Sequence, residues 1–134
     1  MRTLAIGDIH GSCTALKTLA DYVGFTADDV IVTLGDYIDR GPDSKGVIDF
    51  LIELRKSHQV ITLKGNHEVM MENARHSDQE LYFWLFNGGE EAIASFGSNR
   101  PALIATEIPS KYWTFIKSCE RYYEADHHIL VHGG

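Results

Sequence analysis

Three short apolar segments of the chain follow one pattern. Residues 4–8, 30–36 and 60–66 each form an aliphatic run that closes on Gly followed by Asp or Asn. Short runs of this kind, rich in β-branched residues, are typical of strands that are buried on both faces of a parallel sheet. The pattern therefore predicts three parallel strands, which end at Asp8, Asp36 and Asn66.

The two segments between these runs have the apolar spacing of amphipathic helices. Residues 12–23 and 44–56 carry apolar side chains at helical intervals, which are Leu16, Leu19, Ala20 and Val23 in the first and Val47, Ile48, Leu51 and Leu54 in the second. Ser12, and Asp43 or Ser44, are the expected N-caps. The resulting βαβαβ order predicts an α/β fold with a parallel or mixed sheet and helices on both faces.

The rest of the chain is predicted to be mainly helical. We expect a helical region over residues 67–118, with turns at Asn87-Gly88-Gly89 and at Gly97-Ser98-Asn99-Arg100-Pro101. Its apolar stripes are interpreted as packing residues, namely Leu81, Trp84 and Leu85, then Ala92, Ile93 and Phe96. A last apolar run, residues 127–131, is predicted to be a fourth strand that ends at His132.

Residues that can bind metals follow each predicted strand. Ligands of open α/β sheets bind beyond the carboxyl ends of the strands, and the Gly before Asp8, Asp36 and Asn66 allows a close backbone approach. His10 lies two residues after Asp8, on the same side of an extended backbone. Carboxylate oxygens beside imidazole nitrogens suit manganese, iron or zinc better than calcium, so the sequence predicts a transition-metal site here.

Composition narrows the function further. The chain has 134 residues, 44% of them apolar, which suits one domain, and 12 basic against 19 acidic residues give a net charge of −7. This charge argues against nucleic acid or a membrane surface as a partner. Cys13 and Cys119 are interpreted as reduced thiols. Because no run approaches about 20 apolar residues and the N-terminus lacks signal-peptide character, we expect a cytoplasmic protein.

Four motifs resemble, in order and spacing, those of the Ser/Thr phosphoprotein phosphatases in the calcineurin-like metallophosphoesterase family. Trp84 with Asn87-Gly88-Gly89 is also similar to bacterial-type members, and the resemblance covers essentially the whole chain. The four motifs are Gly7-Asp8-Ile9-His10-Gly11, Gly35-Asp36-Tyr37-Ile38-Asp39-Arg40-Gly41-Pro42, Gly65-Asn66-His67-Glu68 and His132-Gly133-Gly134.

The resemblance implies two divalent metal ions as cofactors. Manganese is favoured, with iron or zinc as alternatives. Asp8, His10 and Asp36 would hold one ion, and Asp36, Asn66 and His132 the other, so that Asp36 bridges them. The resemblance also implies a metallophosphoesterase-like fold, in which a water between the ions attacks phosphorus.

Three further residues receive roles from the resemblance. His67 would be the general acid for the leaving group and would contact the substrate phosphate, Asp39 would orient His67, and Arg40 would bind the phosphate. Glu68 fits either a direct role or that of a buried acceptor. The other histidines are not assigned to the site, namely His58, His76, His127 and His128.

The resemblance leaves several functions open. The first hypothesis is a serine/threonine protein phosphatase acting on phosphoprotein. The alternatives are a symmetrical hydrolase of diadenosine tetraphosphate, which is a small phosphoester, and a non-catalytic metal-binding remnant. The family continues beyond the position of His132 with another histidine and a second arginine. We therefore expect residues 1–134 to be the N-terminal part of one metallophosphoesterase domain, truncated at the C-terminus.

Overall fold

The computed structural model describes residues 1–133, and a three-stranded parallel sheet lies at its centre. Strands β1 (Thr3–Ile6), β2 (Val30–Thr33) and β3 (Gln59–Thr62) are hydrogen bonded in the order β1-β2-β3. All four residues of β2 are buried, as expected for a central strand between two covered faces. The predicted α/β class and its parallel strands are confirmed.

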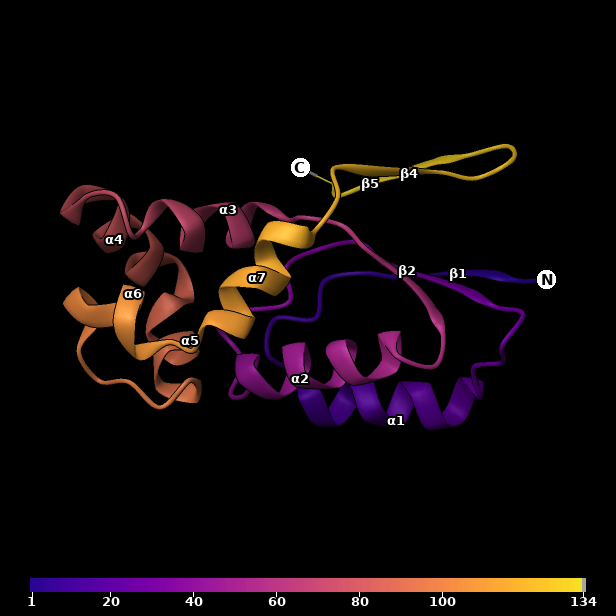
Figure 1. The fold of residues 1–134 in the computed structure, drawn as a ribbon, viewed down its shortest axis with the longest axis horizontal. Helices are drawn as coiled ribbons and strands as arrows, with labels where there is room; N and C mark the ends of the chain where they lie inside the picture. The colour runs from indigo at the N-terminus through magenta and orange to yellow at the C-terminus, as the bar shows by residue number, and fades with distance from the viewer. Residues whose placement is uncertain (134) are drawn as a thin grey trace.

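Helices α1 (Cys13–Val23) and α2 (Ser44–Arg55) form the two crossovers and pack on the same face of the sheet (Figure 1). The strand order runs in one direction, so two right-handed crossovers must share a face. The sequence predicts helices on both faces of the sheet, whereas both crossover helices of residues 1–133 lie on one face. Asp43 is the N-cap of α2 and accepts the backbone N–H of Gly46 over 2.8 Å, whereas Ser12 caps α1 without a side-chain hydrogen bond.

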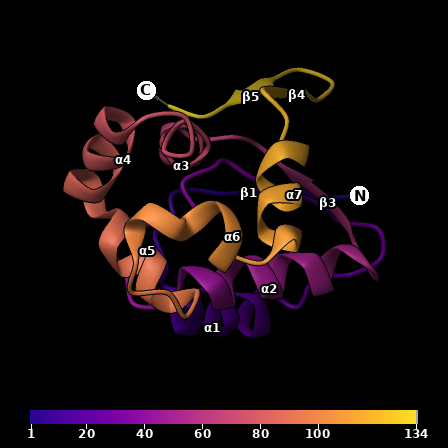
Figure 2. The same ribbon diagram turned by 60° about the vertical axis from the view of Figure 1, so that its left-hand side comes forward.

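The other face of the sheet is covered by a β-hairpin. Strands β4 (Tyr122–Glu124) and β5 (Ile129–Val131) are antiparallel and lie on the side of the sheet opposite α1 and α2 (Figures 1 and 2). Tyr123 and Leu130 pack on a small core that includes Val32 and Leu63. The last apolar run is therefore a strand, but it belongs to a second sheet and not to the parallel one. The backbone of Glu120 bonds to residues 62 and 64, which turns the chain into this hairpin at the edge of β3.

The predicted helical region starts at the end of β3. It contains α3 (Asn66–Asn73), α4 (Asp78–Trp84), a π-helical turn η1 (Leu85–Gly89), α5 (Glu90–Ser95), a 3-10 turn η2 (Pro101–Leu103), α6 (Ile104–Glu107) and α7 (Ser110–Ser118). Their apolar sides join those of α1 and α2 in the main core. Figure 1 shows α4, α5 and α6 beyond the carboxyl ends of the parallel strands. No helix among residues 1–133 is both long and apolar enough to span a bilayer.

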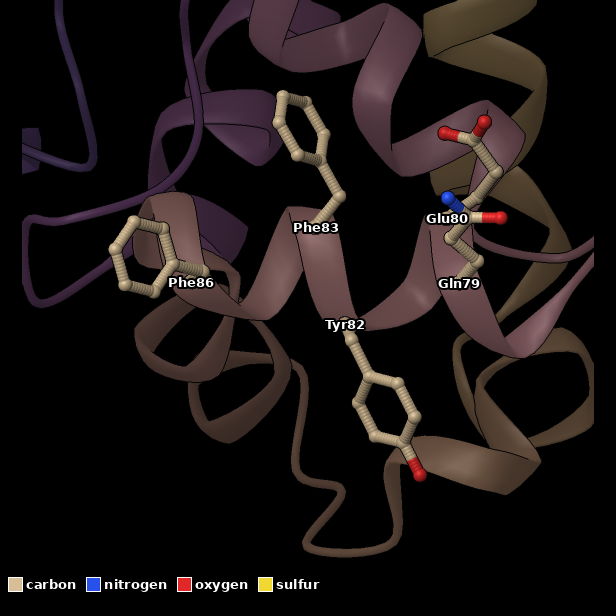
Figure 3. Close-up of a pocket in the computed structure, with 5 residues that line it drawn as sticks. All are labelled: Gln79, Glu80, Tyr82, Phe83 and Phe86. Atoms are coloured by element: carbon tan, nitrogen blue, oxygen red, sulfur yellow. The ribbon is translucent and has the colours of Figure 1, made fainter.

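Helix α4 and the turn η1 that follows it carry exposed aromatic rings on their outer side. Tyr82, Phe83 and Phe86 are 66%, 55% and 90% exposed, and together with Gln79 and Glu80 they line a shallow surface pocket (Figure 3). Trp84, in the same stretch, is completely buried. The α4 segment therefore has an aromatic outer surface and an inner side that faces the core.

Candidate active site and metal centre

Four residues near the ends of β1 and β2 have a strained backbone. His10, Asp36, Asp39 and Arg40 have φ angles of 43°, 55°, 78° and 70°, and no other non-glycine residue among positions 1–133 has a positive φ. Each such residue costs about 1–3 kcal/mol and persists only where the surrounding structure holds it in place. All four are predicted site residues, so the strain is concentrated where the sequence predicts the chemistry.

Asp36 is the buried centre of the site, with 3% of its surface exposed. It follows Gly35, whose φ is 105° and whose hypothetical Cβ would lie 2.6 Å from the backbone nitrogen of Gly65. Glycine is therefore required for the β2 and β3 loops to approach each other. This contact brings the second and third motifs together.

The predicted metal ligands converge around Asp36. Its Oδ2 lies 3.3 Å from Nε2 of His132 and 3.7 Å from Nε2 of His10. The carboxylate of Asp8 lies 3.8 Å from Nε2 of His10 and 3.9 Å from Nδ1 of His132. The side-chain amide of Asn66 is 2.9 Å from Nε2 of His132. Five ligand-type residues from four separate loops thus surround one point.

Two of these histidines are oriented by backbone carbonyls. Nδ1 of His10 lies 2.8 Å from the carbonyl oxygen of Ile38, and Nδ1 of His132 lies 2.8 Å from that of Leu34. A carbonyl accepts but cannot donate, so each Nδ1 carries a proton, and in the neutral imidazole Nε2 then keeps its lone pair. Both Nε2 atoms face Asp36. Neutral imidazoles held in this way, beside carboxylates, are a donor set that fits divalent transition metals.

Asp36 belongs to two groups of possible metal ligands, and within each group the ligand atoms lie within 4.8 Å of one another. One group contains His10 and His67, and the other contains Asp8 and His132. A site for two ions that share Asp36 is consistent with both groups. The pairing of the remaining ligands with a particular ion stays a prediction, because these groups divide the residues differently from the sets that the family resemblance implies.

His67 and Asp39 form a buried pair beside this centre. Nδ1 of His67 lies 2.7 Å from Oδ2 of Asp39, and the ring of His67 meets that of His10 edge to face, with 4.7 Å between centroids. Trp84 also donates its Nε1–H to Oδ2 of Asp39 over 2.8 Å. Because Nδ1 of His67 is engaged by Asp39, Nε2 is the ring nitrogen that remains for a substrate.

Burial favours the neutral form of each member of this pair. It raises the pKa of Asp39 to about 8, although the Trp84 hydrogen bond opposes the rise, and it lowers the pKa of His67 below the usual value. The negative charges of Asp36 and Asp8 favour the charged form of His67, whereas His10 and Arg40 oppose it. This environment suits a group that gives up a proton readily.

Glu68 has the role of a buried acceptor. Its carboxylate accepts backbone N–H bonds from Asp36 over 2.7 Å, Tyr37 over 3.0 Å and Gly65 over 2.9 Å. Burial raises the pKa of Glu68 to about 7, and the three amide donors oppose the rise. Of the two roles that the sequence leaves open, the geometry supports the structural one.

Arg40 extends from the same loop as Asp39 toward the solvent. Its guanidinium has no hydrogen-bond or ion-pair partner among residues 1–133, which leaves its donors free for an anion. Its backbone N–H donates to the carbonyl of Gly88 over 3.1 Å. The turn after α4 thus contacts the residue that is predicted to bind phosphate.

Trp84 contributes to the site although helical spacing predicts only a packing role for it. Its indole N–H donates to Oδ2 of Asp39. The spacing of Trp84 and Asn87-Gly88-Gly89, which is similar to that in bacterial-type phosphatases, was the available signal. The unassigned histidines lie outside the cluster; His58, for example, is 2.8 Å from the hydroxyl of Ser57.

The chain belongs to the calcineurin-like phosphoesterase family, whose family model matches residues 1–134. Serine/threonine-protein phosphatase 1 of Salmonella typhimurium is 42% identical over 86 residues, which are 63% of this chain and 38% of that protein. A symmetrical bis(5'-nucleosyl)-tetraphosphatase of Nitrosomonas europaea is 29% identical over 135 residues, which are 100% of this chain and 45% of that protein. The chain therefore matches less than half the length of both relatives.

Solved structures agree with the fold. A cold-active protein tyrosine phosphatase superimposes with a TM-score of 0.65 and 23% sequence identity, covering 98% of this chain and 40% of that chain. At this identity the likeness shows the fold alone. The matching family model shows which family the chain belongs to, and the kind of ester is a separate question.

Proposed function

We propose that this chain carries the metal-binding part of a phosphatase that acts on phosphoserine and phosphothreonine in proteins. The observation that carries the proposal is the buried His67–Asp39 pair directly beside the Asp36-centred ligand cluster. The identity to a serine/threonine-protein phosphatase over 63% of the chain supports this substrate class. The intact proton donor argues against a non-catalytic remnant.

The residues present divide the chemistry of ester hydrolysis among them. Asp8, His10, Asp36, Asn66 and His132 would hold two divalent ions, most suitably manganese, with iron or zinc as alternatives. When bound, these ions would supply Lewis acidity that activates water and neutralises phosphate charge. Charge on the phosphate oxygens would also be met by the exposed guanidinium of Arg40.

The leaving oxygen requires a proton as its bond to phosphorus breaks. His67 would donate that proton from Nε2, and Asp39, bonded to Nδ1, would hold the ring in position and stabilise the charged form. This arrangement needs no covalent phosphoenzyme. Cys13 and Cys119 are both buried, and burial raises the pKa of each thiol, so neither is suited to act as a nucleophile.

A second candidate function is the symmetrical hydrolysis of a dinucleoside tetraphosphate. Exposed Phe83 and Phe86 lie within five residues of Gly88, which contacts Arg40, and aromatic rings beside a phosphate site can stack on a nucleobase. The relative from Nitrosomonas europaea is named for this activity.

One assay separates the two candidates and tests the metal requirement. The full chain, loaded with manganese, is given a phosphothreonine peptide and diadenosine tetraphosphate at equal concentrations, and released phosphate and ADP are measured. We expect faster turnover of the peptide, and no turnover of either substrate after chelation or with Asp36→Asn. The control is Asp21→Asn, an exposed carboxylate of α1. Faster dinucleotide hydrolysis would favour the second candidate, and turnover that survives chelation would overturn both.

A further inference from the structure

The indole of Trp84 makes one specific polar contact, and that contact is in the site. Its Nε1–H bonds to Oδ2 of Asp39, the same oxygen that lies 2.7 Å from Nδ1 of His67. The other oxygen, Oδ1, is buried and has no partner among residues 1–133. Rotation of the carboxylate is therefore restrained through Oδ2 alone, by the indole on one side and the imidazole on the other.

We propose that Trp84 is a positioning residue, which holds Oδ2 of Asp39 against His67 and so fixes the direction in which His67 delivers its proton. This inference rests on the proposed function, because it assigns the orientation of the general acid. Trp84 itself would contact neither the substrate nor a metal ion. Its effect on catalysis would pass entirely through Asp39 and His67.

The turn that follows α4 is built around this indole. A Cβ on Gly89 would lie 2.7 Å from Cδ2 and 2.8 Å from Cε2 of Trp84, so only glycine lets the backbone close over the ring. Gly88, at φ 102°, packs in the same way against Arg40. The Asn87-Gly88-Gly89 motif thus packs directly against Arg40. It also packs against Trp84, which in turn contacts Asp39.

The competing explanation is that Trp84 only fills volume in the core. The chain offers a matched control for this, because Trp113 is also buried, at 9% exposure, and its Nε1 has no hydrogen-bond partner among residues 1–133. Trp→Phe at either position keeps an aromatic ring and removes the indole N–H. Only at position 84 does that N–H reach the site.

The first test compares substrates whose leaving groups differ in their need for a proton. With Trp84→Phe we expect kcat on phenyl phosphate to fall about 10-fold or more, a part of the usual worth of a general acid. KM should change little, and kcat on p-nitrophenyl phosphate should fall much less. Trp113→Phe should not lower kcat on phenyl phosphate more than kcat on p-nitrophenyl phosphate. Equal losses on both substrates would overturn the proposal, whereas a wild-type chain without phosphatase activity would count against the proposed function instead.

A double-mutant cycle tests whether Trp84 acts through His67. In a His67→Asn background, Trp84→Phe should cause no further loss of kcat on phenyl phosphate, because the group that it positions is gone. Additive losses in the double variant would show that Trp84 acts by another route. The proposal requires both results. Trp84→Phe alone must lower kcat on phenyl phosphate selectively, and in the His67→Asn background it must cause no further loss.

A third measurement does not depend on turnover. The imidazole proton between His67 and Asp39 is expected as a slowly exchanging NMR resonance in the wild-type chain. Trp84→Phe should speed its exchange with water, and Trp113→Phe should not. If Trp84→Phe does not fold, benzothienylalanine at position 84 keeps the bicyclic shape without the N–H. An unchanged exchange rate in folded Trp84→Phe, or in the benzothienylalanine variant, would overturn the proposal.

Discussion

Oε1 of Glu68 accepts the backbone N–H of Asp36 over 2.7 Å, and this bond fixes the backbone of the central metal ligand to the first turn of α3. The same oxygen accepts the N–H of Gly65, the N-cap residue of that helix. Glu68 therefore holds the β2 loop and the start of α3 in one arrangement. The strained φ of Asp36 is stabilised by this contact, which lies away from the reacting atoms.

Replacing Glu68 with Gln should destabilise the fold more than an ordinary surface change. The amide nitrogen of Gln would face backbone donors, and the loss of a buried charge-assisted acceptor should cost about 2–4 kcal/mol of unfolding free energy. Glu72→Gln is the control, since Glu72 lies on the same helix and forms a partly buried pair with Lys64, worth about 1 kcal/mol. Urea denaturation measures both. Equal losses would contradict the structural role of Glu68.

His67→Asn should separate chemistry from metal binding. The variant keeps a polar side chain but cannot donate a proton at neutral pH, so turnover on an alkyl phosphate should fall by about 10²–10⁴-fold. Metal content, measured by atomic absorption, should stay at the wild-type value. Loss of bound metal in this variant would instead show that His67 is a metal ligand. This is the competing role, because His67 belongs to one of the two groups of possible ligands.

The parallel sheet and the convergence at its edge could be predicted because both follow from local pattern. Aliphatic runs that close on Gly and Asp indicate buried strands and their ends, and parallel strands bring those ends together. The face on which α1 and α2 pack could not be predicted. It depends on the order of strands in space, which hydrophobic spacing does not encode.

Two features fell outside what sequence patterns report. The hairpin has short strands with exposed Tyr122, Ile129 and Val131, so neither its pairing nor β4 has a clear alternating signal. The contact of Trp84 with Asp39 was missed because helical spacing predicts burial and says nothing about the direction of an N–H.

The stability of the sheet should depend on pH through a pair at the end opposite to the site. Arg2 donates to both carboxylate oxygens of Asp29, at 2.9 and 2.8 Å, and holds the pKa of Asp29 at about 2. The ionised form is favoured in the folded state, so this stabilisation is present above about pH 4, the unfolded pKa, and is lost as the pH falls toward 2. We expect the Tm of Asp29→Asn to depend less steeply on pH over that range than the wild type. Asp28→Asn, at an exposed neighbour, should match the wild type; identical slopes in all three would contradict the assignment.

Gly88→Ala should impair catalysis through Arg40. The new Cβ would lie 2.6 Å from Cγ and 2.8 Å from the backbone nitrogen of Arg40, so the phosphate-binding loop has to shift. Gly97 is the matched control, because its φ of 88° is similarly left-handed and its hypothetical Cβ meets nothing within 4 Å. Both variants should lose about 1 kcal/mol of stability from backbone strain. Only Gly88→Ala should lower kcat/KM, by roughly 10–100-fold, because displacement of a positioning group by about 1 Å has costs of this order. Similar kcat/KM values for the two variants would mean that the Gly88 contact does not position Arg40.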